Sequence, residues 1–280
     1  MMKRFSERYG LNKSRAEIQL KSMDSALRNR LWNLLCAFYW SKEDYAIYAK
    51  PSDEMAGFLW ELWNEFFKLP VDSIPVYWWE IHRKIRKLYF SLEWYKVYDF
   101  IEFMANNFPN PELNEKFMKA CNVVLEEELS GYRFIGGKIT PITAKEEISE
   151  IEEALESPID TVRTHLETAL ERMSDRQSPD YRNSIKESIS AVEALCKIIA
   201  NDEKANLGKA LDIIEEKIGL HKALKKAFDS LYGYTSSAEG IRHALLDEPS
   251  LTFEDAKFML VSCSAFINYL ISKASKAGLI

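Results

Sequence analysis

The chain has 280 residues, of which 47% are hydrophobic and 29% are charged, and its formal net charge is −6. This balance is typical of a folded globular protein and excludes an intrinsically disordered one. Ten glycines and nine prolines are few for this length, which favours helices. No stretch of about 18 uncharged apolar residues and no secretory signal is recognised. We therefore expect a soluble helical protein of about two domains.

The cysteines are isolated from one another and lie mostly in apolar periodic segments, at Cys36, Cys121, Cys196 and Cys263. Because no CxxC pair is present, neither a zinc site nor a disulfide framework is predicted. A reducing cytoplasm is the predicted location. The acidic net charge disfavours a general nucleic-acid coat but is compatible with a small basic cleft.

The tryptophans indicate two unlike halves, because all seven lie within the first 94 residues. In this aromatic-rich half, apolar residues recur at helical spacing, with Asp24 as an N-cap and Pro111 as a first-turn proline. The predicted helices cover about 24–40, 53–70, 76–89, 91–106 and 111–129.

Residues 132–141 have a different pattern, in which two short β-prone runs flank Gly136 and Gly137. This pattern predicts a β-hairpin, and since two strands alone are marginally stable, the hairpin must pack on a helix. Thr143 and Glu146 then fit a capping box for an acidic helix that links the two halves.

The second half has the pattern of a helical bundle. Its longest predicted helix runs over about 180–200, followed by one between the cap residues Asn206 and Gly219. Further helices are predicted over about 221–232, 240–246 and 253–274. The predicted fold is all-α with one hairpin, and the predicted domains are 1–150 and 151–280.

Several common catalytic motifs are absent from the sequence. No P-loop, GxGxxG, HExxH or GxSxG pattern occurs, which excludes Walker-type nucleotide hydrolysis and the common hydrolase templates. None of the four histidines has a histidine or cysteine at ligand spacing. We therefore expect no metal and no cofactor.

Arg242 and His243 are the most suggestive pair in the sequence. An arginine can hold a scissile phosphate while a neighbouring imidazole moves a proton, which suits RNA cleavage. The alternative is an ion pair between Arg242 and Glu239 with a packed histidine, and spacing alone favours this alternative.

Two further groups of residues could serve a site in this half. Arg182 and Glu187 lie on the helix over 180–200 and could support it, although a solvated helix face is the favoured interpretation. A basic cluster could contact an RNA backbone, or form only a solvated face. It comprises Lys222, Lys225 and Lys226.

In the aromatic-rich half, the basic run 82–87 follows Trp78 and Trp79. Cations interleaved with aromatic rings suit binding of a single nucleic-acid strand. The same spacing is that of an amphipathic core helix with a charged outer face, and this second interpretation is favoured.

Two sets of residues resemble known families. The segments 5–10, 18–19, 22–24, 27–33, 130–134, 141–143 and 147–148 resemble the AbiJ N-terminal domain 4 of bacterial phage-defence proteins. The segments 184–193 and 240–245 resemble a HEPN-like helical bundle.

The resemblance implies an abortive-infection effector whose C-terminal domain is a metal-independent endoribonuclease acting as a homodimer. It implies an arginine–polar–xxx–histidine motif, in which Arg242 matches the arginine and His243 the polar position. Asp247 stands where the motif has its terminal histidine. Arg242 would then bind phosphate, His243 would transfer protons, and Arg182 and Glu187 would support them.

The leading hypothesis is therefore a cytoplasmic HEPN-type ribonuclease that acts on RNA. The alternative is a non-catalytic HEPN module that binds a nucleotide or a protein as a sensor or subunit of a defence complex, which Asp247 and the acidic charge favour. A third hypothesis is a purely structural subunit. The expected partners are RNA, a second copy of the chain and a phage-derived trigger or defence-complex protein, without a membrane.

Overall fold

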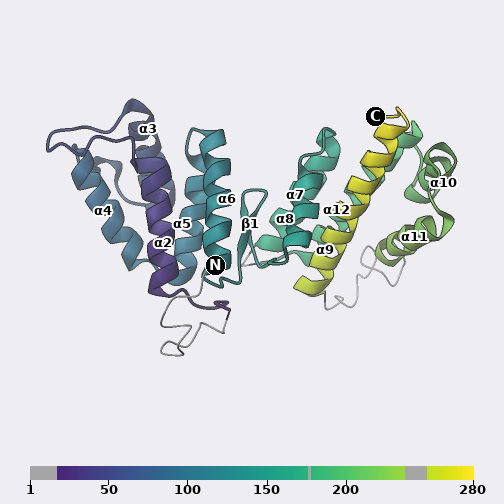
Figure 1. The fold of residues 1–280 in the computed structure, drawn as a ribbon, viewed down its shortest axis with the longest axis horizontal. Coiled ribbons are helices and arrows are strands. Elements are labelled where there is room, and N and C mark those ends of the chain that lie inside the picture. The colour runs from purple at the N-terminus through teal and green to yellow at the C-terminus, as the bar shows by residue number, and fades with distance from the viewer. Residues whose placement is uncertain (1–17, 176–177, 237–250) are drawn as a thin grey trace, which may run out of the picture. The chain divides into compact units, whose positions relative to one another are not determined.

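The computed structural model describes residues 18–175, 178–236 and 251–280. The fold is all-α apart from one two-stranded hairpin (Figure 1). The chain forms two compact units, residues 1–141 and 142–280.

Helices dominate the first unit and follow the predicted order. They are α2 (Ser25–Leu35), a π-helix η1 (Cys36–Trp40), α3 (Asp53–Glu61), a π-helix η2 (Leu62–Phe67), a short 3₁₀-helix η3 (Val71–Ser73), α4 (Trp78–Ser91), α5 (Trp94–Asn107) and α6 (Pro111–Glu127). Asp24 caps α2 by accepting a hydrogen bond from the Leu27 N–H at 2.9 Å, as predicted. Asn110 caps α6 in the same way, with Pro111 in its first turn.

Aromatic side chains fill the core of the first unit. Helix α2 packs against α5 and α6. The largest fully buried side chains of this core are Trp40, Trp63, Trp78, Tyr89, Tyr98, Phe100, Phe117 and Phe134. The concentration of aromatic residues in the first half is thus explained largely by packing.

The hairpin consists of β1 (Arg133–Ile135) and β2 (Lys138–Thr140), with Phe134 opposite Ile139. Its turn residues Gly136 and Gly137 have φ of 51° and 80°, a region that favours glycine. The strands contact α6 and α5 respectively. The prediction of a hairpin supported by helices is therefore confirmed.

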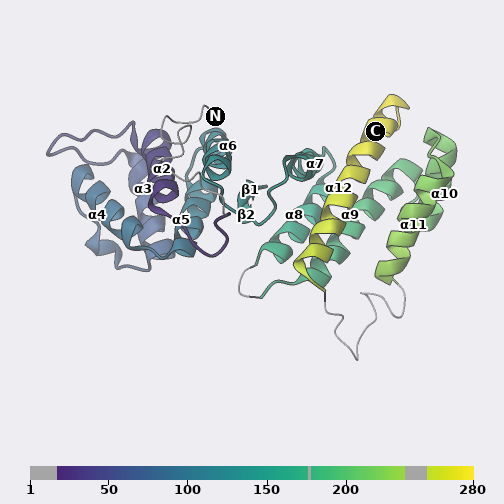
Figure 2. The same ribbon diagram turned by 60° about the horizontal axis from the view of Figure 1, so that its bottom comes forward.

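The second unit is a bundle of helices. They are α7 (Lys145–Leu155), α8 (Asp160–Ser174), α9 (Tyr181–Ala200), α10 (Leu207–Ile218), α11 (Lys222–Ser236) and α12 (Phe253–Lys276). Helix α9 is central, because α8, α10, α11 and α12 all pack against it (Figure 2). Asn206 and Gly219 bound α10 as predicted, the glycine with a φ of 65°.

The predicted capping box of α7 is wrong. The N-cap is Ala144, and no side chain of the described residues caps this end. The helix begins one residue later than predicted, which places Glu147 within 2.7 Å of Lys257 on α12. The capping box that does form is at the start of α12, between Thr252 and Asp255.

Helix α7 belongs to the second unit by its packing. It contacts α12 and α8, and its Ile151 and Ala154 are fully buried. The Asn268 side chain of α12 donates hydrogen bonds to the backbone oxygen and a carboxylate oxygen of Glu150, both at 2.9 Å. The predicted linking helix is thus an integral layer of the bundle.

Within the described residues, α12 is the one helix whose length and composition would suit a membrane span. Its side chains Met259, Cys263, Phe266 and Leu270 are buried in the bundle. This burial is the pattern of a core helix, and it accounts for the apolar composition without a membrane.

Candidate functional site

The predicted catalytic residues Arg242 and His243, and Asp247 with them, lie outside the described residues. The chain continues into α12, where Phe253 contacts the ring of Tyr181 with centroids 6.4 Å apart. Tyr181 is the first residue of α9, the helix that carries Arg182 and Glu187.

A histidine and a carboxylate meet across helices α8 and α9. Nδ1 of His165 lies 2.6 Å from Oε2 of Glu187. Their side chains are 37% and 24% exposed, so the pair is open to solvent. A carboxylate bonded to Nδ1 fixes the ring's orientation and directs Nε2 outwards, which is how histidines that transfer protons are commonly held.

Small side chains bring these two helices together. Ser184 is fully buried and donates from Oγ to the Ala169 carbonyl at 2.7 Å. Ala169 lies one turn after His165, and Glu187 lies about one turn after Ser184, so α8 and α9 run antiparallel at this point. The serine contact therefore sets the register that pairs His165 with Glu187.

Arg182 does not join this pair. It lies five residues before Glu187 on α9, which places the two side chains about 140° apart around the helix. Near it, Asp180 caps α9 by accepting from the Asn183 N–H at 3.0 Å. The Asn183 side chain donates to Asp180 as well, at 2.6 Å. Burial raises the pKa of Asp180, but the two hydrogen bonds from Asn183 and the charges of Arg172 and Arg182 lower it overall. The charge of Arg182 thus acts at the start of α9.

The three predicted RNA-contacting lysines lie at the start of α11 with different surroundings. Lys222 and Lys226 are exposed. Lys225 is paired with Asp212 and, at 2.9 Å, with Glu215 of α10, and these carboxylates raise its pKa. Lys225 therefore ties α11 to α10, whereas Lys222 and Lys226 are available to a phosphate backbone.

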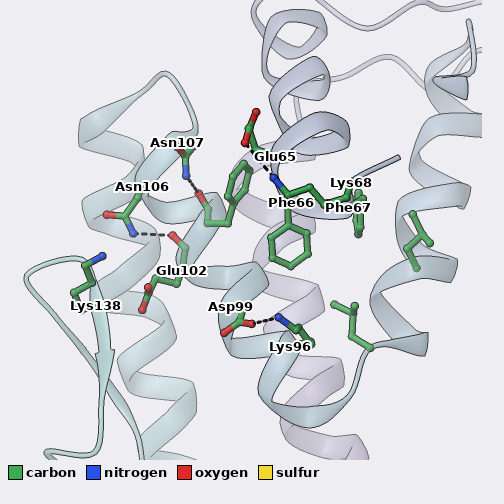
Figure 3. A pocket seen from close by; sticks show the side chains of 13 residues that line it. Glu65, Phe66, Phe67, Lys68, Lys96, Asp99, Glu102, Asn106, Asn107 and Lys138 are labelled. Atoms are coloured by element: carbon green, nitrogen blue, oxygen red, sulfur yellow. Dashed lines mark hydrogen bonds and ion pairs between the residues drawn. The ribbon is translucent and has the colours of Figure 1, made fainter. Parts of the chain in front are cut away.

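The first unit contains an open cavity of about 720 Å³ (Figure 3). Its polar groups largely satisfy one another: Lys96 pairs with Asp99 at 2.8 Å, and Glu102 accepts from the Ile139 N–H at 2.6 Å. The lining residues are Glu65, Phe66, Phe67, Lys68, Leu88, Leu92, Lys96, Asp99, Glu102, Phe103, Asn106, Asn107 and Lys138. They include neither histidine, the most frequent general base, nor cysteine, the most reactive nucleophile near neutral pH.

A cysteine and a histidine also approach each other in the first unit, where Sγ of Cys36 lies 3.9 Å from Nε2 of His82. Burial raises the pKa of the Cys36 thiol and, together with Arg86, lowers the pKa of His82. Both groups are therefore held neutral, which is the opposite of a thiolate–imidazolium nucleophile. Over the described ranges, no cluster of three or more metal-ligating side chains occurs.

The segments that carry the N-terminal resemblance meet in space. The Gln19 N–H donates to the Leu129 carbonyl at 2.8 Å, and the Gly131 N–H donates back to the Gln19 carbonyl at 3.0 Å. The Tyr132 hydroxyl donates to the Leu20 carbonyl at 2.6 Å. A Cβ on Gly131 would meet the end of the Leu20 side chain, so glycine permits this close approach without moving that side chain. These residues therefore fasten the start of the described chain to the end of α6.

Residues 3–157 match the family described as AbiJ N-terminal domain 4. The chain belongs to this family. The family name links the protein to abortive infection, a form of phage defence, as the sequence resemblance implied. Neither a curated protein nor a solved structure gives a significant match.

The basic run on α4 has the amphipathic pattern favoured from the sequence. Trp78, Ile81 and Ile85 are fully buried, while Arg83 and Arg86 are exposed. Sequence reasoning did not find His165, because its carboxylate partner lies 22 residues away on another helix. Glu187 was a candidate from the sequence, but its position off the apolar stripe of α9 favoured a solvated helix face.

Proposed function

We propose that the chain is an abortive-infection effector whose second unit is a HEPN-like, metal-independent endoribonuclease. The observation that carries this proposal is the His165–Glu187 pair, with 2.6 Å between Nδ1 and Oε2 on a solvent-open face. It supplies an oriented proton-transfer group in the bundle to which the Arg242 motif belongs. The family of the N-terminal part supports the biological role.

The proposed reaction needs two proton transfers and an anchor for phosphate. One histidine removes the proton of the RNA 2′-hydroxyl, whose oxygen forms a bond to phosphorus. The bond from phosphorus to the 5′-oxygen breaks, and a second acid protonates that oxygen. The products are a 2′,3′-cyclic phosphate and a 5′-hydroxyl.

In this proposal, Arg242 holds the scissile phosphate and His243 with His165 carries the protons. Asp247 occupies the position of the motif's terminal histidine, so His165 would supply the function that this position lacks. The proximity of Phe253 to Tyr181 supports the arrangement, because it anchors the chain after Asp247 beside α9. Exposed Lys222 and Lys226 would contact the RNA backbone, and two copies of the chain would assemble in the cytoplasm.

The test is cleavage of total cellular RNA and of tRNA by the purified full chain in EDTA. We expect Arg242→Ala, His243→Ala and His165→Asn each to lower the rate by about 10²-fold or more. Glu187→Gln should lower it by about tenfold, since the amide holds the ring less well. Mapped ends should be cyclic phosphates.

His221→Asn is the matched control, because His221 is an exposed histidine of the same unit whose Nδ1 accepts from the Ala223 N–H at 3.2 Å. Asparagine preserves such a cap, so this variant should cleave at the wild-type rate. Activity that depends on an added divalent ion would contradict the proposal. Full activity of both single variants, His165→Asn and Arg242→Ala, would also contradict the proposal.

A non-catalytic nucleotide- or protein-binding module is the second candidate, favoured by Asp247 in place of the motif histidine. Expression in a bacterial host separates the two. An enzyme should be toxic as wild type and harmless as Arg242→Ala. A sensor or subunit should give equal growth for both chains and should purify reproducibly with a partner.

A further inference from the structure

The outer face of α4 carries positive charges that no carboxylate of the described residues neutralises. The helix holds four cations, Arg83, Lys84, Arg86 and Lys87, against the single carboxylate Glu80. Within the described chain, Arg83, Arg86 and Lys87 form no ion pair, whereas exposed lysines elsewhere in the unit do. In a chain of net charge −6, this local excess of positive charge favours an anionic partner.

Aromatic rings alternate with these cations along one stripe. The Arg83 guanidinium lies 5.0 Å from the ring centre of Trp79, and that of Arg86 lies 4.8 Å from the ring centre of Phe90. Positions 79, 83, 86 and 90 share one helix face over about 16 Å. We call these four residues the α4 stripe.

Exposed tyrosines adjoin the start of the stripe. Tyr45 and Tyr48 are 48% and 77% exposed, and the Tyr48 ring lies 5.6 Å from that of Tyr77. We call residues 45–48 the tyrosine loop. The loop is held against α4, because Trp79 Nε1 donates to the Ile47 carbonyl at 3.0 Å. Its rings are thus presented to solvent by a fixed backbone.

Most of this surface lies outside the core, although Phe90 and Tyr45 pack partly against it, with ring centroids 5.5 Å from Trp32 and 5.3 Å from His82 respectively. Helix α4 buries the opposite face, with Trp78, Ile81, Ile85 and Tyr89 fully inside the core. Within the first unit, α4 lies on the side away from the hairpin (Figures 1 and 2). Exposed rings beside unneutralised cations favour a partner that offers both flat apolar faces and negative charge.

We propose that the α4 stripe and the tyrosine loop bind single-stranded nucleic acid. Unpaired bases stack on the exposed tyrosines, and Arg83, Arg86 and Lys87 contact successive phosphates. The bases of a duplex are stacked on one another, so a duplex would contact only the cations of this surface and not the tyrosine rings. This makes the first unit a strand-binding module, a role that goes beyond the proposed cleavage and does not depend on it.

The test measures fluorescence anisotropy of a labelled 2′-O-methyl uridine 12-mer with the full chain. This probe lacks a free 2′-hydroxyl, so failure of the proposed cleavage does not affect the result. Arg83→Gln/Arg86→Gln should weaken binding by about tenfold or more in 0.1 M salt. It should also make the slope of log affinity against log salt shallower by about 1.4, as expected for two lost contacts to a single strand.

Lys116→Gln/Lys119→Gln is the matched control, since it removes the same charge from exposed positions on α6 of the same unit. It should bind as wild type does. Tyr48→Ala should cost about fivefold in affinity through lost stacking, and Tyr48→Phe should restore it.

Three results with the oligonucleotides would overturn the proposal. They are no saturable binding by wild type up to about 100 µM, the weak end of non-specific binding; equal affinities of wild type and the double glutamine variant; and equal affinity for a duplex of the same length. Binding to phosphatidylserine vesicles without binding to the oligonucleotide would assign the surface to a membrane and also overturn it.

Discussion

His82 is a half-buried histidine that packing keeps neutral. Its ring lies between 5.3 and 6.0 Å from four aromatic rings, those of Trp32, Trp40, Tyr45 and Trp78. Burial lowers the pKa of His82, and the charge of Arg86 lowers it further. Protonation therefore opposes folding at this residue, because the imidazolium would lose its hydration inside an aromatic box.

This environment predicts a pH dependence of stability. An unfolded histidine has a pKa near 6.5, so below that pH the unfolded chain binds a proton that native His82 resists. The free energy of unfolding should then fall as the pH drops from about 7.5 through 6.5 towards the lower native pKa. Urea unfolding followed by tryptophan fluorescence measures it. His82→Phe should show a smaller fall, and parallel curves for the two chains would contradict the assignment.

The sequence alone could supply residue types but not the pairs they form. Glu187 was a candidate from the sequence, with a solvated helix face as the favoured interpretation, whereas its pairing with His165 depends on the register of two helices. That register rests on the contact between Ser184 and Ala169, which no spacing rule encodes. The roles of Arg242, His243 and Asp247 remain predictions.

At the scale of elements, the hairpin shows how side chains replace a missing neighbouring strand. The Asn122 amide on α6 donates to the Phe134 carbonyl at 2.9 Å and accepts from the Phe134 N–H at 2.7 Å. Two strands have outer backbone groups that require partners, and this amide satisfies one pair of them.

Asn122→Ala should therefore destabilise the first unit by about 1–3 kcal/mol, the cost of unpaired, partly buried backbone groups. Amide exchange of residues 133–140 should accelerate more than that of α5. Asn107→Ala is the control, since among the described residues the exposed Asn107 side chain donates to Phe103 of its own helix alone. Equal exchange in both variants would argue against the supporting role of Asn122.

Local sequence signals predicted the start of a helix correctly where an N-cap residue marks it. Asp24 and Asn206 each begin a helix as expected from their side-chain oxygens. At the start of α7 the predicted box between Thr143 and Glu146 does not form, while the neighbouring Glu147 pairs with the distant Lys257 of α12. Tertiary contacts of this kind are invisible to a window of a few residues.

At the scale of the molecule, the family match and the packing divide the chain differently. The match extends to residue 157, whereas the first compact unit ends at residue 141. Helix α7 lies between these limits, yet it buries Ile151 and Ala154 against a bundle whose other helices follow the matched segment. The N-terminal family segment therefore ends in a helix that needs the second unit to cover its apolar face.

Separate cores predict separate unfolding transitions. All seven tryptophans lie in the first unit, so their fluorescence reports that unit, while far-UV circular dichroism reports the helices of both. Ile185→Ala removes a fully buried side chain of α9 and should cost the second unit about 2–5 kcal/mol. In urea it should shift part of the dichroism transition and leave the fluorescence midpoint unchanged. Ile101→Ala, equally buried in α5, should move the fluorescence midpoint. If Ile185→Ala moved both signals together, the two units would form one cooperative structure.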